Sequence, residues 1–194
     1  MNINILLFDD FETLDAFGPV EILGRLDGFQ MNFFSMNGGV VTSRQGTEII
    51  TKPFDQIEDD GIVVIPGGQG TRLLVNDYNF VKKLYKIGSC SKYCLSICTG
   101  SALLASTGLL DGRKATSNKR AFEWVMSVNT KVDWISKARW VVDGKFYTSS
   151  GVSAGMDMSL GFVCDLAGRD LAEEIANAIE YIWNPDKDED FFLL

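Results

Sequence analysis

The stretch Ile97-Cys98-Thr99-Gly100-Ser101-Ala102 joins a short apolar run, Tyr93 to Ile97, to a helical pattern of small residues. The apolar run is typical of a buried strand, and the small residues after it predict a helix. A cysteine at such a turn is expected to be exposed at the edge of a sheet, beside the unpaired N–H groups and the positive end of the helix dipole. This environment should lower the pKa of the Cys98 thiol and make it a nucleophile.

Strand-like and helix-like segments alternate outward from this turn. Strands are expected at 3–8, 31–36, 46–51 (an edge piece), 62–65, 93–98, 115–117, 132–135, 139–142 and 146–149. Helices are expected at 13–26 (capped by Thr13), 77–87, 99–107, 119–128, 152–167 and 170–183. The alternation predicts an α/β fold, a three-layer sandwich whose mainly parallel central sheet carries helices on both faces, as in flavodoxin-like proteins, with a nucleophile elbow at Cys98.

Length and composition narrow the class of protein. The 194 residues suit a single domain, expected at 1–183, followed by a tail, 184–194. The acidic part of the tail, 184–190, is expected to be mobile, and its apolar end, 191–194, is expected to dock on the body or on a second subunit. The net charge of −8 argues against nucleic acid as a partner. No run of about 18 apolar residues predicts a membrane span, and no signal peptide is evident, so a cytoplasmic location with free thiols is expected.

The chain contains no histidine, so a carboxylate must do any proton transfer for Cys98. Cys90, Cys94 and Cys164 are interpreted as structural. The regular spacing of Cys90, Cys94 and Cys98 is a possible metal-ligand pattern, but the sequence shows no fourth ligand, so no metal site is predicted. No cofactor is implied.

Three loops leave predicted strands at the carboxyl edge of the sheet, where ligands bind in open α/β folds: 9–15, 66–70 and 98–100. Cys98 is the candidate nucleophile. The backbone N–H groups of Gly68 and Thr99, beside Gly67, are the candidate anion hole. Asp15 is the candidate acid, because burial and a neighbouring thiolate would raise the pKa of its carboxyl group and keep it protonated near neutrality.

These segments resemble the ThiJ/PfpI superfamily, whose fold is related to that of class I glutamine amidotransferases. The resemblance extends from Ile3 to about Trp183 and is specific as a set. It is carried by 14–19 (LDAFGP), 66–68 (PGG), 96–100 (SICTG), 108–116 (GLLDGRKAT), 142–145 (VDGK) and 148–157 (TSSGVSAGMD).

The Asp-x-x-Gly-Pro segment and the threonine after the cysteine resemble isocyanide hydratases and the sensor domains of some AraC-type regulators. The resemblance implies that Cys98 attacks an isocyanide carbon, that Asp15 exchanges protons during hydration to an N-substituted formamide, and that Thr99 contributes to the site. It implies a small-molecule substrate and a homodimer. Peptidase-like relatives place histidine after the cysteine, so a protease or amidase activity is disfavoured. Where many relatives have a histidine shortly after the Ala-Thr motif, this chain has Asn118.

Other functions remain open at this point. A redox or stress sensor would oxidise Cys98 to a sulfinic acid, and a ligand-binding protein would have no turnover. Deglycase-like relatives commonly use a glutamate near the cysteine together with a histidine, which is absent here. Structural or capping roles are expected for the acidic residues Asp9, Asp10, Glu12 and Asp157. Core or interface roles are expected for the tryptophans Trp124, Trp134, Trp140 and Trp183.

Overall fold

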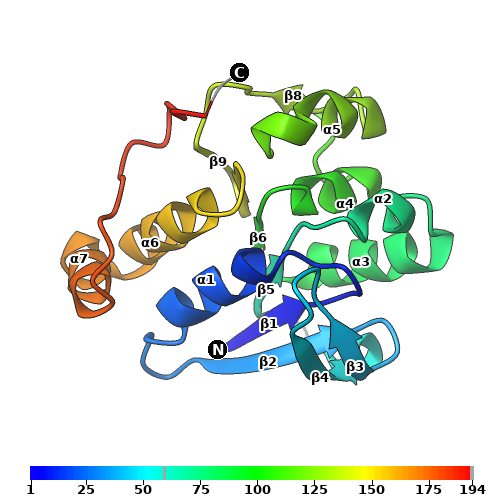
Figure 1. The fold of residues 1–194 in the computed structure, drawn as a ribbon, viewed down its shortest axis with the longest axis horizontal. Helices are drawn as coiled ribbons and strands as arrows, with labels where there is room; N and C mark the ends of the chain where they lie inside the picture. Colours follow the sequence, from blue (N-terminus) through cyan, green and yellow to red (C-terminus); the bar gives the residue numbers. More distant parts are fainter. Residues whose placement is uncertain (59, 193–194) are drawn as a thin grey trace.

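The computed structural model describes residues 1–58 and 60–192, which form the three-layer α/β arrangement that the sequence predicts (Figure 1). The central sheet has eight strands in the order β3-β4-β2-β1-β5-β6-β10-β9. They are β1 Asn2–Leu6, β2 Gln30–Ser35, β3 Gly39–Thr42, β4 Glu48–Pro53, β5 Ile62–Ile65, β6 Tyr93–Ser96, β9 Trp140–Asp143 and β10 Phe146–Ser149. All neighbouring strands are parallel except the hairpin pairs β3–β4 and β9–β10 at the two edges.

Helices cover both faces of this sheet. One face carries α1 Thr13–Leu23, α6 Ala154–Ala167 and α7 Arg169–Ala178, which pack on one another, and the other carries α2 Thr71–Leu74, α3 Tyr78–Cys90 and α4 Gly100–Ser106 (Figure 1). Beyond α4 lie α5 Phe122–Val128, the 3₁₀ turn η2 Lys119–Ala121 and a small sheet of β7 Lys114–Ala115 and β8 Asp133–Trp134. A second 3₁₀ turn, η1 Phe54–Gln56, follows β4.

Burial on both faces explains the continuous apolar character of the inner strands. Every residue of β5 is buried, and Ile3 and Ile5 of β1 have no exposed surface. Continuous Val/Ile runs of this kind are what a parallel sheet covered by helices requires. The inner strands β1, β5 and β6 therefore bring their carboxyl ends, and the loops that follow them, to one edge of a rigid layer.

Several expectations for individual elements are wrong. Thr13 does not cap its helix; it is the first helical residue, and its hydroxyl bonds the side chains of Ser43 and Gln45. The strand β4 lies inside the sheet because β3, which has no strong sequence signal, pairs outside it. The last helix ends at Ala178 rather than at 183.

The acidic tail is held at Asp190, contrary to the expected mobility. Its backbone N–H donates to the Lys137 carbonyl at 2.8 Å, and its carboxylate, 4% exposed as a residue, lies 3.6 Å from the Arg139 guanidinium. A buried cation thus provides the partner that a solvent-exposed tail would lack. Phe191 and Phe192 are exposed and so do not dock on the body of this chain, whereas docking on a second subunit stays a prediction; residues 193–194 lie outside the described residues.

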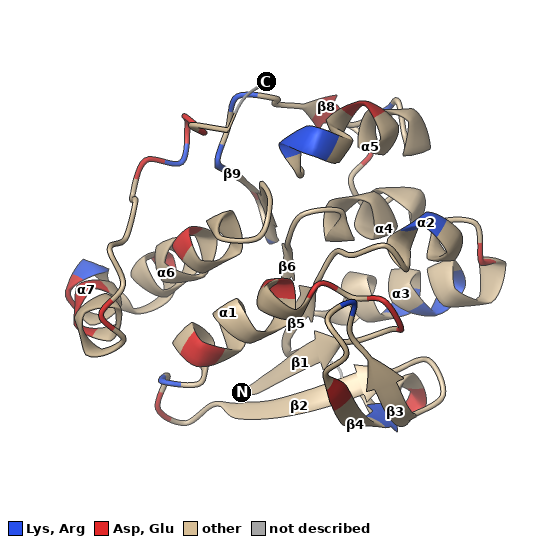
Figure 2. Cartoon of the chain, viewed as in Figure 1, with Lys and Arg blue, Asp and Glu red and all other residues tan. Residues whose placement is uncertain are grey.

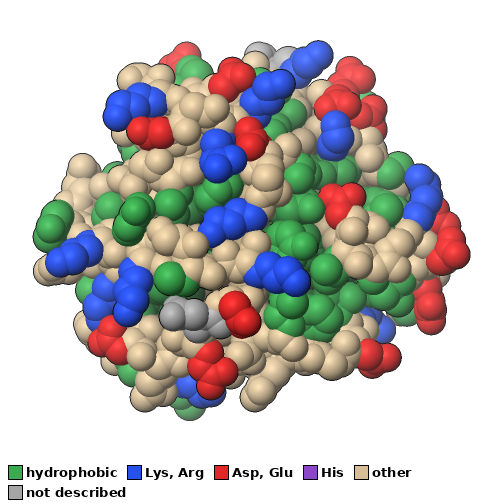
Figure 3. All heavy atoms as spheres, turned by 180° about the vertical axis from the view of Figure 1, so that it is seen from behind, with side chains coloured by type: hydrophobic (Ala, Val, Ile, Leu, Met, Phe, Trp, Pro, Cys, Tyr) green, Lys and Arg blue, Asp and Glu red, His purple; other side chains and the backbone are tan. Residues whose placement is uncertain are grey.

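The surface shows charged side chains of both signs. On the face opposite to that of Figure 1, Lys, Arg, Asp and Glu are scattered around exposed apolar area (Figure 3). Among the described residues, no helix is long and apolar enough to cross a membrane.

Candidate active site

Cys98 occupies a strained turn between β6 and α4. Its φ of 55° lies in the left-handed region that residues with a Cβ rarely adopt. The turn is held from several sides: the Cys98 N–H donates to the Ser150 carbonyl at 3.1 Å, and the Cys98 carbonyl accepts from the hydroxyls of Ser117 at 2.8 Å and Ser101 at 3.0 Å. A Cβ at Gly100 would overlap the Ile65 carbonyl oxygen, so only glycine lets the turn pack this closely on β5. The predicted elbow is therefore present, and its strain is balanced by these bonds.

Asp15 lies in the first turn of α1 and has no exposed surface. Its Oδ2 accepts the Gly67 N–H at 2.9 Å, whereas Oδ1 is buried without a hydrogen-bond partner among the described residues. Burial raises the pKa of Asp15 to about 7. The Gly67 hydrogen bond opposes this shift, the Glu12 charge adds to it, and the contact with the Cys98 thiol opposes it. The expected protonation near neutrality is supported, with burial as the main cause.

The environment of the Cys98 sulfur differs from the expectation of an exposed thiol with a lowered pKa. The residue is only 7% exposed, and burial, followed by the Asp15 charge, raises the pKa of its thiol. The backbone N–H groups of Thr99 and Val152 and the side-chain amide of Asn118 act in the opposite direction. The helix that follows has only seven residues, so its dipole does not outweigh desolvation.

Two of the predicted anion-hole groups already have partners. The Gly67 N–H is bound to Asp15, and the Gly68 N–H donates to the Thr99 Oγ1 at 3.0 Å. The Thr99 hydroxyl also lies 3.1 Å from the Thr71 hydroxyl, so it ties the 66–70 loop to the elbow. Of the predicted groups, the Thr99 N–H faces the sulfur, and the Val152 N–H and the Asn118 side chain face it as well. Sequence reasoning missed Val152, because nothing in the motif places the loop after β10 beside the elbow.

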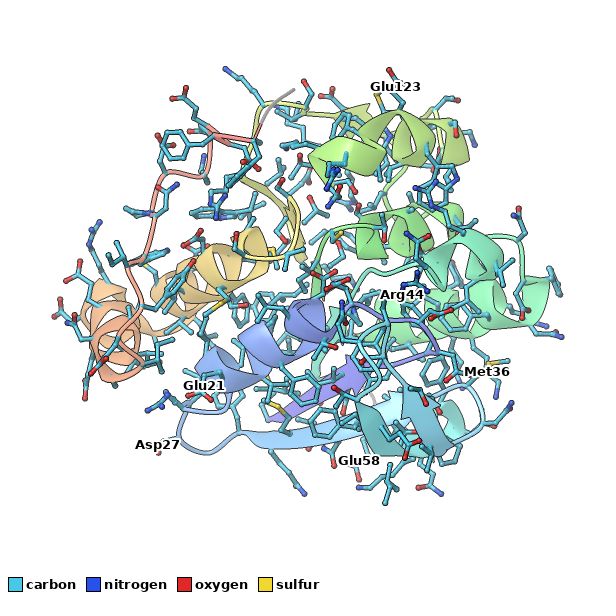
Figure 4. All side chains as sticks on the ribbon, in the orientation of Figure 1. Glu21, Asp27, Met36, Arg44, Glu58 and Glu123 are labelled. Atoms are coloured by element: carbon cyan, nitrogen blue, oxygen red, sulfur yellow. The ribbon has the colours of Figure 1, made fainter. Side chains whose placement is uncertain are left out.

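Cys98 opens into a cavity of about 420 Å³ at the carboxyl edge of the sheet. The uncharged residues of its lining include Gly68 and the three residues that contact the sulfur, Thr99, Asn118 and Val152. Charged side chains complete the lining: Glu12, Arg44, Arg72 and Arg120. Arg44 comes from the turn between β3 and β4 and lies near the middle of the molecule, beside the first turn of α1 (Figure 4). The arginines gave no motif signal in the sequence.

Most of the remaining acidic residues and cysteines have structural surroundings. Asp157, in the first turn of α6, is buried against Arg139 and accepts from the Tyr181 hydroxyl at 3.1 Å. Asp9 Oδ1 accepts the Thr42 N–H at 2.9 Å. Among the cysteines, Cys94 is buried and its thiol contacts the Gly88 carbonyl, Cys90 is exposed, and Cys164 is half-buried.

The sequence and the fold of this chain are similar to those of several known proteins. The chain is 30% identical to an isonitrile hydratase of Pseudomonas putida over 191 residues, covering 97% of this chain and 82% of that protein. It is 32% identical to a deglycase of Thermococcus kodakarensis over 155 residues, covering 77% and 89% of the two chains. The crystal structure of a ThiJ/PfpI family protein from Pseudomonas syringae superposes with a TM-score of 0.84 at 30% identity, over 95% of this chain and 76% of that one.

The match to a family profile agrees with these similarities. Residues 1–164 match the DJ-1/PfpI family, and that range contains β1, the elbow and the carboxyl edge described above. The chain therefore belongs to the DJ-1/PfpI family.

Proposed function

We propose that this protein hydrates isocyanides to N-substituted formamides, with Cys98 as nucleophile and Asp15 as proton donor and acceptor. The observation that carries the proposal is the buried Asp15 carboxyl, which contacts the Cys98 thiol and has one oxygen with no hydrogen-bond partner among the described residues. We assign to that carboxyl the proton exchange at the atom that bonds to the Cys98 sulfur. The similarity to an isonitrile hydratase across almost the whole chain supports the same reaction.

The first step uses the single proton that the two groups share. In the reactive form Cys98 is a thiolate and Asp15 is protonated. The sulfur attacks the terminal carbon of R–NC, forming the S–C bond, and that carbon takes the Asp15 proton. The product is a thioimidate, Cys98–S–CH=N–R, beside an Asp15 carboxylate. The strained elbow fixes the sulfur, and Gly67 fixes the carboxyl group, so that both act on one atom.

The second step returns the enzyme to its starting state. A water molecule gives a proton to Asp15 as its oxygen bonds to the thioimidate carbon. Proton transfer from Asp15 to the nitrogen and cleavage of the S–C bond then release R–NH–CHO, and the remaining water proton stays with the Cys98–Asp15 pair. The N–H groups of Thr99 and Val152 and the amide of Asn118 stabilise the departing thiolate.

The proposal is tested by following the conversion of para-nitrophenyl isocyanide to its formamide by chromatography. Cys98→Ser and Asp15→Asn are each expected to reduce kcat by at least ~10³-fold. Cys164→Ser, which alters a half-buried thiol outside the cavity lining, is the control and keeps wild-type turnover. Absence of formamide with the wild-type protein contradicts the proposal.

A deglycase activity is the second candidate, because one relative of that name is 32% identical over 155 residues. The absence of histidine and the use of an aspartate argue for the hydratase. Incubation with methylglyoxal separates the two: the hydratase proposal predicts no lactate above the Cys98→Ser background. A peroxide sensor is less well supported, since burial and a raised pKa protect the Cys98 thiol from oxidation.

We also propose that the protein acts on a small molecule as a homodimer. Val40 and Ile50 lie opposite each other on the edge hairpin β3–β4, and they are 58% and 82% exposed. Such an apolar cross-strand pair is suited to contact with a second copy. Light scattering after gel filtration is expected to give twice the mass of the single chain, which is 21.5 kDa. A monomeric mass contradicts this proposal.

A further inference from the structure

The arginines of this chain divide into two groups. Four of the seven form close ion pairs with carboxylates: Arg25 with Glu21 at 2.7 Å, Arg113 with Asp143 at 3.0 Å, Arg139 with Asp157 at 2.5 Å and Arg169 with Glu173 at 2.7 Å. The other three, Arg44, Arg72 and Arg120, line the cavity that contains Cys98. In a chain of net charge −8, this gathering of three arginines around the nucleophile is a local feature of the site.

The cavity arginines are weakly paired. Arg44 lies 3.7 Å from Asp10 in an exposed contact. Within residues 1–58 and 60–192, neither Arg72 nor Arg120 forms an ion pair. Glu12 is the acidic member of the lining, and its carboxylate accepts from the Gln45 amide at 2.7 Å. The lining therefore keeps an excess of positive charge, near an acid and a thiol that are buried.

Arg72 also lies over an aromatic ring. Its guanidinium carbon lies 3.6 Å from the centroid of the Trp124 ring. Stacking on an indole satisfies the face of the guanidinium while leaving its N–H edge free to donate, which suits bidentate binding of a carboxylate or phosphate. Basic residues lie on α2 and on the turn before α5, and both elements are in the upper half of the view in Figure 2.

A second hollow, of about 600 Å³, continues past these cations. It shares Arg72, Arg120 and Ala121 with the Cys98 cavity and adds the aromatic residues Phe122 and Trp124 and the polar residues Lys119, Glu123 and Ser136. A ligand that reaches from the sulfur into this hollow therefore passes Arg72 and Arg120. The order along the path is nucleophile, two arginines and then a mixed wall that includes two aromatic rings.

We propose that the protein selects anionic substrates: the reacting carbon lies at Cys98, and a carboxylate or similar oxyanion a few atoms away is bound by Arg120 and Arg72, with Arg44 at the rim. The substrate class, an isocyanide that carries an oxyanion, rests on the proposed function. The charge preference of the cavity does not, so the two can be tested apart.

The first test measures the charge preference without turnover. The protein is alkylated with iodoacetate or iodoacetamide, two reagents of the same size that differ in charge, and the rate at each cysteine is read by peptide mass spectrometry. The ratio of the iodoacetate rate to the iodoacetamide rate is expected to be about 5- to 50-fold higher at Cys98 than at Cys90, which is exposed on another part of the surface. The ratio should fall as salt is raised.

Variants assign this preference to residues. Arg72→Gln with Arg120→Gln should lower the ratio at Cys98 to the value at Cys90, while the ratio at Cys90 in the same sample stays constant. Arg169→Gln removes the same charge from an exposed, paired site and is the matched control, with the wild-type ratio at Cys98. Equal ratios at Cys98 and Cys90 in the wild type, or a ratio at Cys98 that the double variant leaves intact, overturn the inference.

The second test uses turnover of 4-isocyanobenzoate and its methyl ester. The carboxylate is expected to have the higher kcat/KM, by about tenfold, and the double variant should abolish that difference. Turnover of both compounds with no preference for the carboxylate overturns the inference and leaves the hydratase intact. A preference for iodoacetate at Cys98 with no turnover of either isocyanide supports the anionic cavity and contradicts the proposed function.

Discussion

The Gly67 N–H donates to Asp15 Oδ2 at 2.9 Å, across 52 residues of sequence, and so joins the loop after β5 to the first turn of α1. This bond leaves Oδ1 as the oxygen of Asp15 that has no partner among the described residues. The carboxyl group is thereby oriented by one oxygen and reactive at the other. The proposed proton transfer depends on this orientation and on burial, which raises the pKa of Asp15 to about 7.

Asp15→Asn should stabilise the protein while it abolishes turnover. Between pH 3.8, the ordinary pKa, and about 7, the folded state binds a proton that the unfolded state releases, so wild-type stability falls as pH rises through this window. Asparagine has no such penalty. The free energy of unfolding of the variant, measured with urea, should exceed that of the wild type by up to about 4 kcal/mol at pH 8, because the pKa shift spans about three units and each unit equals ~1.4 kcal/mol. The gain should vanish below about pH 4; an equal gain at both pH values contradicts the assignment.

The pH dependence of kcat/KM should report the shared proton. Below pH 7 the Asp15–Cys98 pair holds two protons and lacks a thiolate; above it, one proton is lost and the reactive form becomes accessible. Activity should therefore rise with an apparent pKa of about 7 and then stay level. A profile that is flat from pH 5 to 8 contradicts a shared proton at this site.

Gly67→Ala should impair activity more than stability. A Cβ at this position would lie 2.6 Å from the Thr99 nitrogen and hydroxyl and 2.9 Å from Asp15 Oδ2, so the loop or the carboxyl group must move. Overpacking of this kind costs about 1–3 kcal/mol, and displacement of Asp15 should lower kcat by ~10²-fold. Thermal unfolding and steady-state kinetics measure the two effects. Wild-type kcat in the variant would show that the Asp15 position is not critical.

The sequence predicted those features of the candidate site that have local signals. The elbow at Cys98 and the buried strand before it were predicted correctly, because strand-to-helix turns and apolar runs have such signals, and the structure places the candidate acid Asp15 in contact with the Cys98 thiol. The contacts of Ser117, Ser150 and Val152 with the elbow were not predicted, since they depend on how β7 and β10 meet β6. The sign of the Cys98 pKa shift was wrong for the same reason: the motif shows the adjacent N–H groups but not the burial, which is the larger effect.

Arg139 forms buried ion pairs that hold Asp190 of the tail, a segment that was expected to be mobile. Arg139 contacts both Asp157 and Asp190, whose side chains are each 1% exposed. Arg139→Met should leave two buried carboxylates without this cation and lower the free energy of unfolding by about 3–5 kcal/mol. Arg169→Met, at an exposed pair, should change it by less than about 1 kcal/mol. Chemical denaturation of both variants checks this, and equal effects would contradict the role of the buried network.

The central claim is that a carboxyl group beside Cys98 stays protonated close to neutral pH. A titration of the Asp15 carboxyl carbon by ¹³C NMR, assigned by its absence in Asp15→Asn, tests this most directly. We predict a midpoint of about 7. A midpoint near the ordinary value of 3.8 would mean that burial does not raise the pKa of Asp15, and it would contradict a proton shared between Asp15 and Cys98 near neutral pH.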